Sequence, residues 1–119
     1  MKPTYGKTVY FINSFMVCAS GEIEGIKKDK YLLNTGKKHV LICKDRVFVT
    51  MNGAIRNKIE SMKDAIEASE KFLNSKKRAE NPNIEAYVRG EILSRDVLEY
   101  YPDAIEFLKS QLQPEIEGF

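Results

Sequence analysis

The residues best suited to bind a ligand are three arginines, Arg56, Arg89 and Arg95, which lie on or beside stretches with helical periodicity. A planar guanidinium can donate two parallel hydrogen bonds to a phosphate group. Each arginine also has an acidic neighbour at helical spacing, and Arg95 lies four residues from both Glu91 and Glu99. Taken one at a time, the arginines are therefore more typical of surface ion pairs than of a phosphate site.

Aromatic and amide side chains could complete such a site. Tyr100 and Tyr101 are neighbours in a helical stretch, where successive side chains point about 100° apart, so one of them should be exposed. An exposed ring beside arginines is suited to stack on a nucleotide base. Phe11 and Asn13 offer a second ring and an amide on one strand face if the strand is continuous. We predict that Tyr100 or Phe11 stacks on a base and that Asn13 or Asn52 contacts its polar edges.

The sequence has no motif for a nucleophile, a metal ion or a phosphate loop. Gly36-Lys37 lacks the upstream glycine and the hydroxyl residue of a P-loop. Cys18 and Cys43 fall in strand-like apolar runs, and with the single His39 they cannot supply four zinc ligands. A general-base role for His39 depends on geometry that a sequence does not give. We therefore expect a protein that is not an enzyme and that needs no metal and no cofactor.

The chain changes character at Asn52-Gly53. Before this pair, short runs rich in β-branched and aromatic residues predict strands, with a hairpin at Asn13-Ser14 preferred over one long strand. The connections are too short to reach a parallel neighbour, so they predict an antiparallel meander. The predicted strands are Thr8–Ile12, Phe15–Ala19, Glu22–Lys27, Tyr31–Leu33, His39–Cys43 and Val47–Met51.

After the pair, apolar residues recur three and four positions apart, which predicts helices. The first helix is expected to run from Gly53 to about Arg78 and to end before Asn81-Pro82-Asn83. A later start at Ser61 is the alternative, because Ser61 begins a sequence that resembles a capping box.

A second helical region is predicted from Ile84, with a break at Gly90 or a new cap at Ser94. Pro102 suits an early position of a last helical segment over residues 103–112.

These elements predict one α+β domain over residues 1–119, with an antiparallel sheet in 1–52, helices in 53–113 and a loose tail in 114–119. Two layers are expected because one apolar sheet face needs a helical cover. The composition, 43% hydrophobic and 30% charged, is ordinary for a soluble globular protein. The sequence shows no membrane span and no signal peptide, so we expect a cytoplasmic protein without membrane contact.

Charge is divided between the two halves of the chain. Residues 1–60 carry 11 Lys and Arg against 5 Asp and Glu, whereas residues 61–119 carry 8 against 12. A nucleic-acid surface would show a larger excess than the overall net charge of +2 and a recognisable module, so nucleic acid is not the expected partner. The split consists mostly of turn lysines against helix carboxylates. A head-to-tail electrostatic contact between protomers would explain it equally well.

One family resemblance rests on the stretch Lys38-His-Val-Leu-Ile-Cys-Lys-Asp-Arg-Val-Phe-Val-Thr-Met-Asn-Gly53 and the helix from Ile55. It resembles the middle of a proteasome-type N-terminal-nucleophile hydrolase, in which two strands and a glycine lead into a long helix. The pattern covers roughly residues 38–75. Thr8 follows Lys7 rather than the glycine of an autoprocessing site, and the chain ends before a second sheet. The resemblance therefore implies a truncated, inactive relative.

A second resemblance concerns the order of elements over the whole chain. A small antiparallel sheet followed by two extended helices is similar to the phage Thoeris anti-defence proteins of the first type. Those proteins sequester cyclic ADP-ribose signals in pockets at the ends of an oligomer without degrading them. The resemblance carries no motif, so it transfers no binding residue. It implies a homodimer or higher homo-oligomer that binds a cyclic nucleotide and counters a bacterial immune system.

Two further expectations concern where a partner would bind. A sheet of short strands under two helices leaves little room for a deep pocket, so we expect ligand pockets between protomers. The alternative function is a protein-interaction module without a small-molecule ligand. In that case an acidic helical face bearing Glu85, Glu91 and Glu99 docks on the partner.

Overall fold

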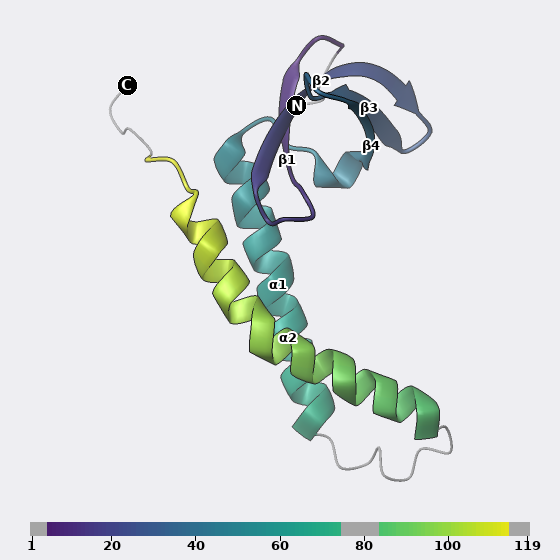
Figure 1. The fold of residues 1–119 in the computed structure, drawn as a ribbon, viewed down its shortest axis with the longest axis vertical. Coiled ribbons are helices and arrows are strands. Elements are labelled where there is room, and N and C mark those ends of the chain that lie inside the picture. The colour runs from purple at the N-terminus through teal and green to yellow at the C-terminus, as the bar shows by residue number, and fades with distance from the viewer. Residues whose placement is uncertain (1–4, 75–83, 115–119) are drawn as a thin grey trace.

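The computed structural model describes residues 5–74 and 84–114 and shows a four-stranded antiparallel sheet followed by two helices that pack together (Figure 1). This confirms the predicted α+β class. The elements are β1 (Thr8–Ile12), β2 (Cys18–Lys27), β3 (Lys30–Asn34), β4 (His39–Cys43), η1 (Lys44–Arg46), α1 (Met51–Asn74) and α2 (Ile84–Ser110).

The strands pair in the order β1-β2-β3-β4, as a meander requires. The predicted strands Phe15–Ala19 and Glu22–Lys27 are wrong as separate elements, because β2 continues through Ser20-Gly21. Gly21 is not a turn residue here. A Cβ atom at Gly21 would lie 3.1 Å from the Cβ of Leu33, so the glycine allows close packing against β3.

The predicted strand Val47–Met51 is also wrong. After β4 the chain passes through η1 and touches β1 at a single bridge, in which Tyr10 and Phe48 exchange hydrogen bonds of 2.7 and 2.8 Å. The apolar run has two different uses. Val47 is buried in the core of the sheet, and Thr50 caps the helix that begins at Met51. The bridge brings the end of the sheet back towards β1, and the sheet curls on itself (Figure 1).

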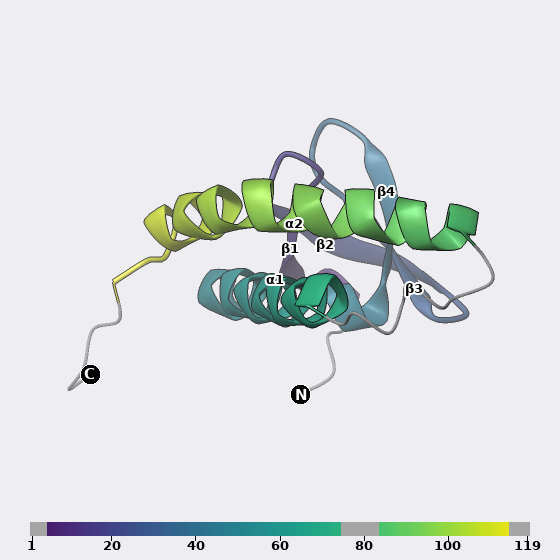
Figure 2. The same cartoon turned by 90° about the horizontal axis from the view of Figure 1, so that it is seen from below.

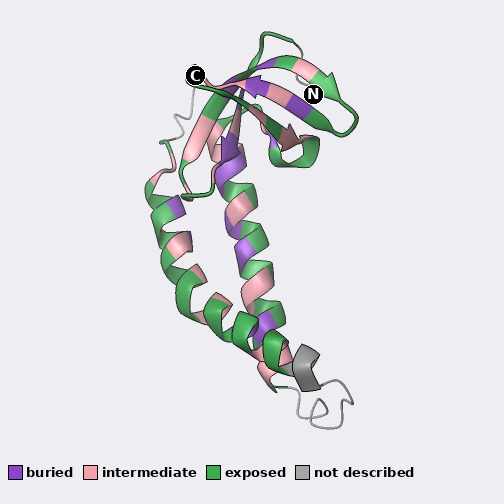
Figure 3. Cartoon of the chain, turned by 45° about the vertical axis from the view of Figure 1, so that its right-hand side comes forward, coloured by how far each residue is buried: buried purple, intermediate pink, exposed green. Residues whose placement is uncertain are grey.

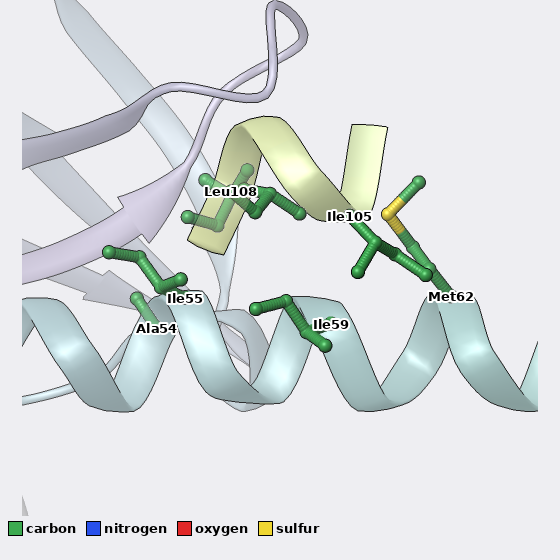
Figure 4. Packing of buried hydrophobic residues seen from close by; sticks show 7 residues of the cluster. Ala54, Ile55, Ile59, Met62, Ile105 and Leu108 are labelled. Carbon is green, nitrogen blue, oxygen red and sulfur yellow. The ribbon is translucent and has the colours of Figure 1, made fainter. Parts of the chain in front are cut away.

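Strand β1 contributes to two apolar cores because its side chains alternate between faces. Val9 and Phe11 point into the curl, whereas Ile12 packs against the helices. The inner sheet core consists of Val9, Phe11, Ile23, Tyr31, Leu33 and Val47. The helix core consists of Ile12, Ala54, Ile55, Ile59, Met62, Ile105 and Leu108 (Figure 4).

Helix α1 begins at Met51, close to the predicted corner at Asn52-Gly53, and runs without interruption to Asn74. Thr50 caps its start, since the Thr50 Oγ1 accepts a hydrogen bond from the Gly53 N–H at 3.0 Å. The alternative start at Ser61 is therefore wrong. The predicted end at Arg78 lies outside the described residues.

Helix α2 is one continuous element, so the predicted breaks at Gly90, Ser94 and Pro102 are wrong. Gly90 and Ser94 serve helix packing instead. A Cβ atom at Gly90 would lie 2.6 Å from the Phe72 ring, and Ser94 is buried. Pro102 is accommodated within the helix, which bends along its length and crosses the lower part of α1 in Figure 1, while Figure 2 shows the two helices as neighbouring layers.

Candidate functional site

A hollow of about 620 Å³ opens at the mouth of the curled sheet. Its wall is built by the end of β1, the turn that follows it, the start of β2, the β3–β4 turn, β4 and Arg46. The first and third turns of an antiparallel meander lie at the same end of the sheet, which is why these segments meet. The floor is apolar and includes Phe11, Ala19, Val40 and Ile42. We call this feature the hollow.

The charged residues that line the hollow are all cations. They are Lys37 and Lys38 from the β3–β4 turn and Arg46 from η1, and no aspartate or glutamate of the described residues lines it. A concave surface of one charge with an apolar wall concentrates ligands of the opposite charge. The hollow is therefore suited to an anion that also has an apolar part.

An exposed aromatic ring stands at the rim of the hollow. Phe15 lines it with 80% of its surface exposed. The turn that carries Phe15 is built by Asn13, whose Oδ1 accepts hydrogen bonds from the N–H groups of Phe15 at 2.9 Å and Val17 at 3.1 Å. Asparagine commonly stabilises turns in this way. Phe15 is thus placed to stack on a flat ligand.

Gln111, which directly follows α2, holds the same turn from outside. The Gln111 Nε2 donates to the carbonyl oxygen of Met16 at 2.7 Å, and its Oε1 accepts from the Cys18 N–H at 2.9 Å. The Gln111 amide therefore bonds to the main chain at two points, Met16 in the turn and Cys18 at the start of β2. Through this contact the helix pair positions one wall of the hollow.

The Cys18 thiol lines the hollow but is not activated as a nucleophile. Burial raises the pKa of the Cys18 thiol above its ordinary value of 9.0, so the thiol is protonated near neutral pH and is a poor nucleophile. His39 does not line the hollow and instead lies 2.7 Å from the Glu24 carboxylate. That carboxylate also accepts a hydrogen bond from Asn34 at 2.8 Å. Among the described residues, no histidine, aspartate or glutamate lines the hollow.

Phe11 and Asn13 are the two predicted site residues that line the hollow. Each of them also has a structural use. Phe11 is only 6% exposed and belongs to the inner sheet core, so its ring is part of the wall, whereas Phe15 offers a free face. The Asn13 Oδ1 is engaged by the turn that it builds.

Asn52 and Arg56 lie at a different place, the start of α1, beside a depression of about 390 Å³. The Asn52 amide forms hydrogen bonds with the main chain of Gln113 at 3.0 and 2.8 Å, so it serves the fold. Arg56 is exposed at the same corner.

Arg89, Arg95 and Tyr100 lie along α2 and do not line the hollow. Arg95 donates to Glu91 at 2.7 Å, which is the ion pair expected from their spacing. Tyr100 is 61% exposed, while Tyr101 packs against the helix core, so Tyr100 is the exposed member of the pair. The structure therefore divides the predicted site among three places on one protomer.

Sequence reasoning did not bring together the four residues that give the hollow its ring and its cations, which are Phe15, Lys37, Lys38 and Arg46. The sequence pattern assigns lysines of this region only to turns. The available signal was topological, because a predicted meander already places the β1–β2 and β3–β4 turns at one end of the sheet. Arg46 carried no such signal, since a strand was expected directly after it.

Comparison with known proteins gives no match to this chain among family models, curated proteins or solved structures. In residues 5–74 and 84–114, no cluster of His, Cys, Asp or Glu is arranged to hold a metal ion. The helices of the described part lack the length and hydropathy needed to cross a bilayer. The site must therefore be interpreted from its own geometry.

Proposed function

We propose that this protein binds a small anionic ligand of the nucleotide class in the hollow and holds it without chemical change in the cytoplasm. One observation carries the proposal. The hollow joins three cationic side chains, Lys37, Lys38 and Arg46, to the exposed ring of Phe15, and the part of the chain that the structure describes adds no carboxylate to its lining.

The size and chemistry of the hollow support this class of ligand. Its volume of about 620 Å³ falls within the range of small-molecule sites, roughly 300–1,000 Å³. The cations are suited to phosphate oxygens, and Phe15 is suited to the face of a base. The protonated Cys18 thiol favours binding over catalysis, as does a lining to which the described residues add no histidine, aspartate or glutamate.

The architectural resemblance to Thoeris anti-defence proteins suggests the more specific ligand, a cyclic ADP-ribose signal whose capture counters a bacterial immune system. In this proposal the protein acts as a homo-oligomer. Arg89, Arg95 and Tyr100 do not line the hollow, so the proposal places no ligand contact on them. The hollow itself needs only one protomer, in contrast to the expectation that a single protomer lacks room for a pocket.

The test is thermal unfolding with a panel of nucleotides that includes the cyclic ADP-ribose isomers. A ligand at a hundred times its Kd stabilises the folded state by about 2.7 kcal/mol, which raises the Tm by several degrees. Mass spectrometry of the ligand released on denaturation should return its mass unchanged. A panel without any shift, or a ligand recovered as product, would falsify the proposal.

Matched variants locate the site. Replacing Lys37, Lys38 and Arg46 by serine should abolish the ligand-induced shift, because it removes the three cations of the hollow. Replacing Lys7, Lys63 and Lys71 by serine removes the same charge from exposed sites outside the hollow and should leave the shift intact. An equal loss in both triple variants would show a general charge effect rather than a site.

The two alternatives make different predictions. An interaction module should lose a protein partner when Glu91 and Glu99 are reversed in charge, and it should bind no nucleotide; Glu85, the third residue of that face, has no described side chain. An inactive hydrolase relative needs a second strand before α1, whereas residues 47–51 make only one bridge to β1. Unchanged turnover after Thr8→Ala and Cys18→Ala together would remove any hydrolase interpretation.

A further inference from the structure

Helix α2 presents an exposed apolar stripe that the fold does not use. Leu93, Tyr100 and Phe107 are 64, 61 and 49% exposed. They are seven residues apart, a spacing that drifts by only about 20° per step around a helix, so they share one side of α2. By contrast, α1 exposes no large apolar side chain, and Figure 3 shows most of the outer surface of α2 as exposed.

The stripe is acidic as well as apolar. Asp96 and Asp103 alternate with its apolar residues at spacings of three and four, which keeps them on the same side of the helix. Neither carboxylate makes an ion pair with any described residue. Two cations of the helix, Arg95 and Lys109, are instead paired with carboxylates on α2 itself. We call Leu93, Asp96, Tyr100, Asp103 and Phe107 the α2 stripe.

A second copy of α2 is a poor partner for this stripe. Two such stripes laid against each other would bring unpaired aspartates of both helices together, and juxtaposed like charges oppose association. The stripe instead requires a surface that is apolar and basic. Charge complementarity of this kind selects the partner and its orientation.

The sheet of the same protein carries a surface of this kind. Lys27, Lys28 and Lys30 surround a shallow depression of about 210 Å³ together with Asp29 and the exposed side chain of Leu41. These residues belong to the β2–β3 turn and β4, and none of them lines the hollow. We call Lys27, Lys28, Lys30 and Leu41 the lysine patch.

We propose that the α2 stripe of one copy docks head to tail on the lysine patch of a second copy. Unpaired aspartates meet lysines in this contact, and an aromatic side chain of the stripe covers Leu41. The contact forms between copies because the sheet lies at one end of the molecule and the helix pair extends away from it (Figure 1). It accounts for the opposite net charges of the two halves of the chain.

The contact is heterologous, since it joins two different surfaces. An open assembly therefore keeps a free stripe on the copy at one end and a free patch on the copy at the other end, until a ring closes. Assembly should therefore grow with protein concentration beyond a dimer of the 13.6 kDa chain. It should weaken as salt is added, because exposed charge pairs are screened. Sedimentation velocity over a range of protein concentrations and a range of salt concentrations measures both effects.

Complementation between two variants tests the geometry directly. A stripe variant, Leu93→Ser with Tyr100→Ser, and a patch variant, Lys27→Glu with Lys30→Glu, should each be monomeric alone. An equimolar mixture should form heterodimers and nothing larger, because one intact patch meets one intact stripe. A symmetric contact through either surface cannot give this result.

The residues involved are exposed, so circular dichroism spectra of both variants should match the wild type. Lys37→Glu, a substitution in the hollow, is the matched control and should assemble like the wild type. A wild-type protein that stays monomeric at every concentration overturns the proposal, as does a mixture that stays monomeric. Assembly of the stripe variant alone also overturns it. None of these outcomes depends on a nucleotide, so the test is independent of the proposed ligand.

Discussion

The side-chain amide of Asn52 and the main chain of Gln113 hold each other by two hydrogen bonds. The Asn52 Nδ2 donates to the Gln113 carbonyl oxygen at 3.0 Å, and the Gln113 N–H donates to the Asn52 Oδ1 at 2.8 Å. The pair joins the first turn of α1 to the segment that follows α2. A side chain that the sequence suggested for ligand binding therefore connects distant parts of the fold.

Asn52→Ala should lower the free energy of unfolding by about 1 kcal/mol, because it removes both hydrogen bonds from a partly exposed site. Urea unfolding measures the change. Asn57→Ala, an exposed asparagine on the same helix, is the control and should stay within about 0.5 kcal/mol of the wild type. Equal effects of the two substitutions would mean that the contact with Gln113 contributes nothing.

The sequence predicted the α+β class and both helical regions because these follow from periodicity. The positions it misjudged are those where a residue has two possible uses. Gly21 and Gly90 are typical of breaks, yet both lie inside regular elements and allow a close neighbour. The apolar run at Val47–Met51 is typical of a strand, but part of it fills the inner sheet core and part begins α1. Only the tertiary contacts decide between such uses.

The candidate site was less predictable than the fold. Phe11 and Phe15 are both aromatic residues near one turn, and their burial differs because β1 turns Phe11 into the inner sheet core. Alternation along a strand assigns residues to two faces, but it does not say which face the sheet will curl around. The three cations of the hollow come from two separate segments of the chain. These three side chains line the same hollow because the sheet curls.

Gly90 is predicted to tolerate a methyl group poorly. Gly90→Ala gains up to about 1 kcal/mol of helix propensity. It also places a Cβ atom 2.6 Å from the Phe72 ring, and overpacking typically costs about 1–3 kcal/mol. The net change should be a lower free energy of unfolding, measured by urea titration.

The residue at position 72 decides whether Gly90→Ala destabilises or stabilises the protein. In a Phe72→Ala protein the clash is absent, so adding Gly90→Ala should be stabilising through helix propensity alone. A double-mutant cycle over Gly90 and Phe72 measures the difference. Destabilisation by the same amount in both backgrounds would show that Phe72 does not limit residue 90.

The Glu24 carboxylate gives the protein a small dependence of stability on pH. Hydrogen bonds from Asn34 and His39 lower the pKa of Glu24 from its ordinary value of 4.5. A lowered folded-state pKa contributes stability above the unfolded-state value, and this contribution is lost as pH falls through the folded-state pKa. The effect is modest because the group is exposed to solvent.

Glu24→Gln should therefore lower the urea midpoint relative to the wild type at about pH 6, and this difference should shrink as the pH is lowered through the acid range. Glu22→Gln, which alters an exposed carboxylate on the same strand, is the control and should not show this pattern. A difference between wild type and Glu24→Gln that persists unchanged in acid would contradict the assignment.

Gln111 links the helix pair to the wall of the hollow. Its substitution should therefore affect the β1–β2 turn more than the rest of the fold. Gln111→Ala removes the acceptor of the Cys18 N–H and the donor to the Met16 carbonyl oxygen. We expect a loss of about 1–2 kcal/mol in the free energy of unfolding and faster hydrogen exchange at the Cys18 amide. Gln113→Ala is the control, because among the described residues the Gln113 side chain bonds to the nearby Gln111 carbonyl and not to the turn. If a nucleotide binds beside Phe15, Gln111→Ala should also weaken its affinity while Gln113→Ala does not, since only the former releases the turn that holds the ring. Unchanged exchange at Cys18 would show that the turn is held without the helix.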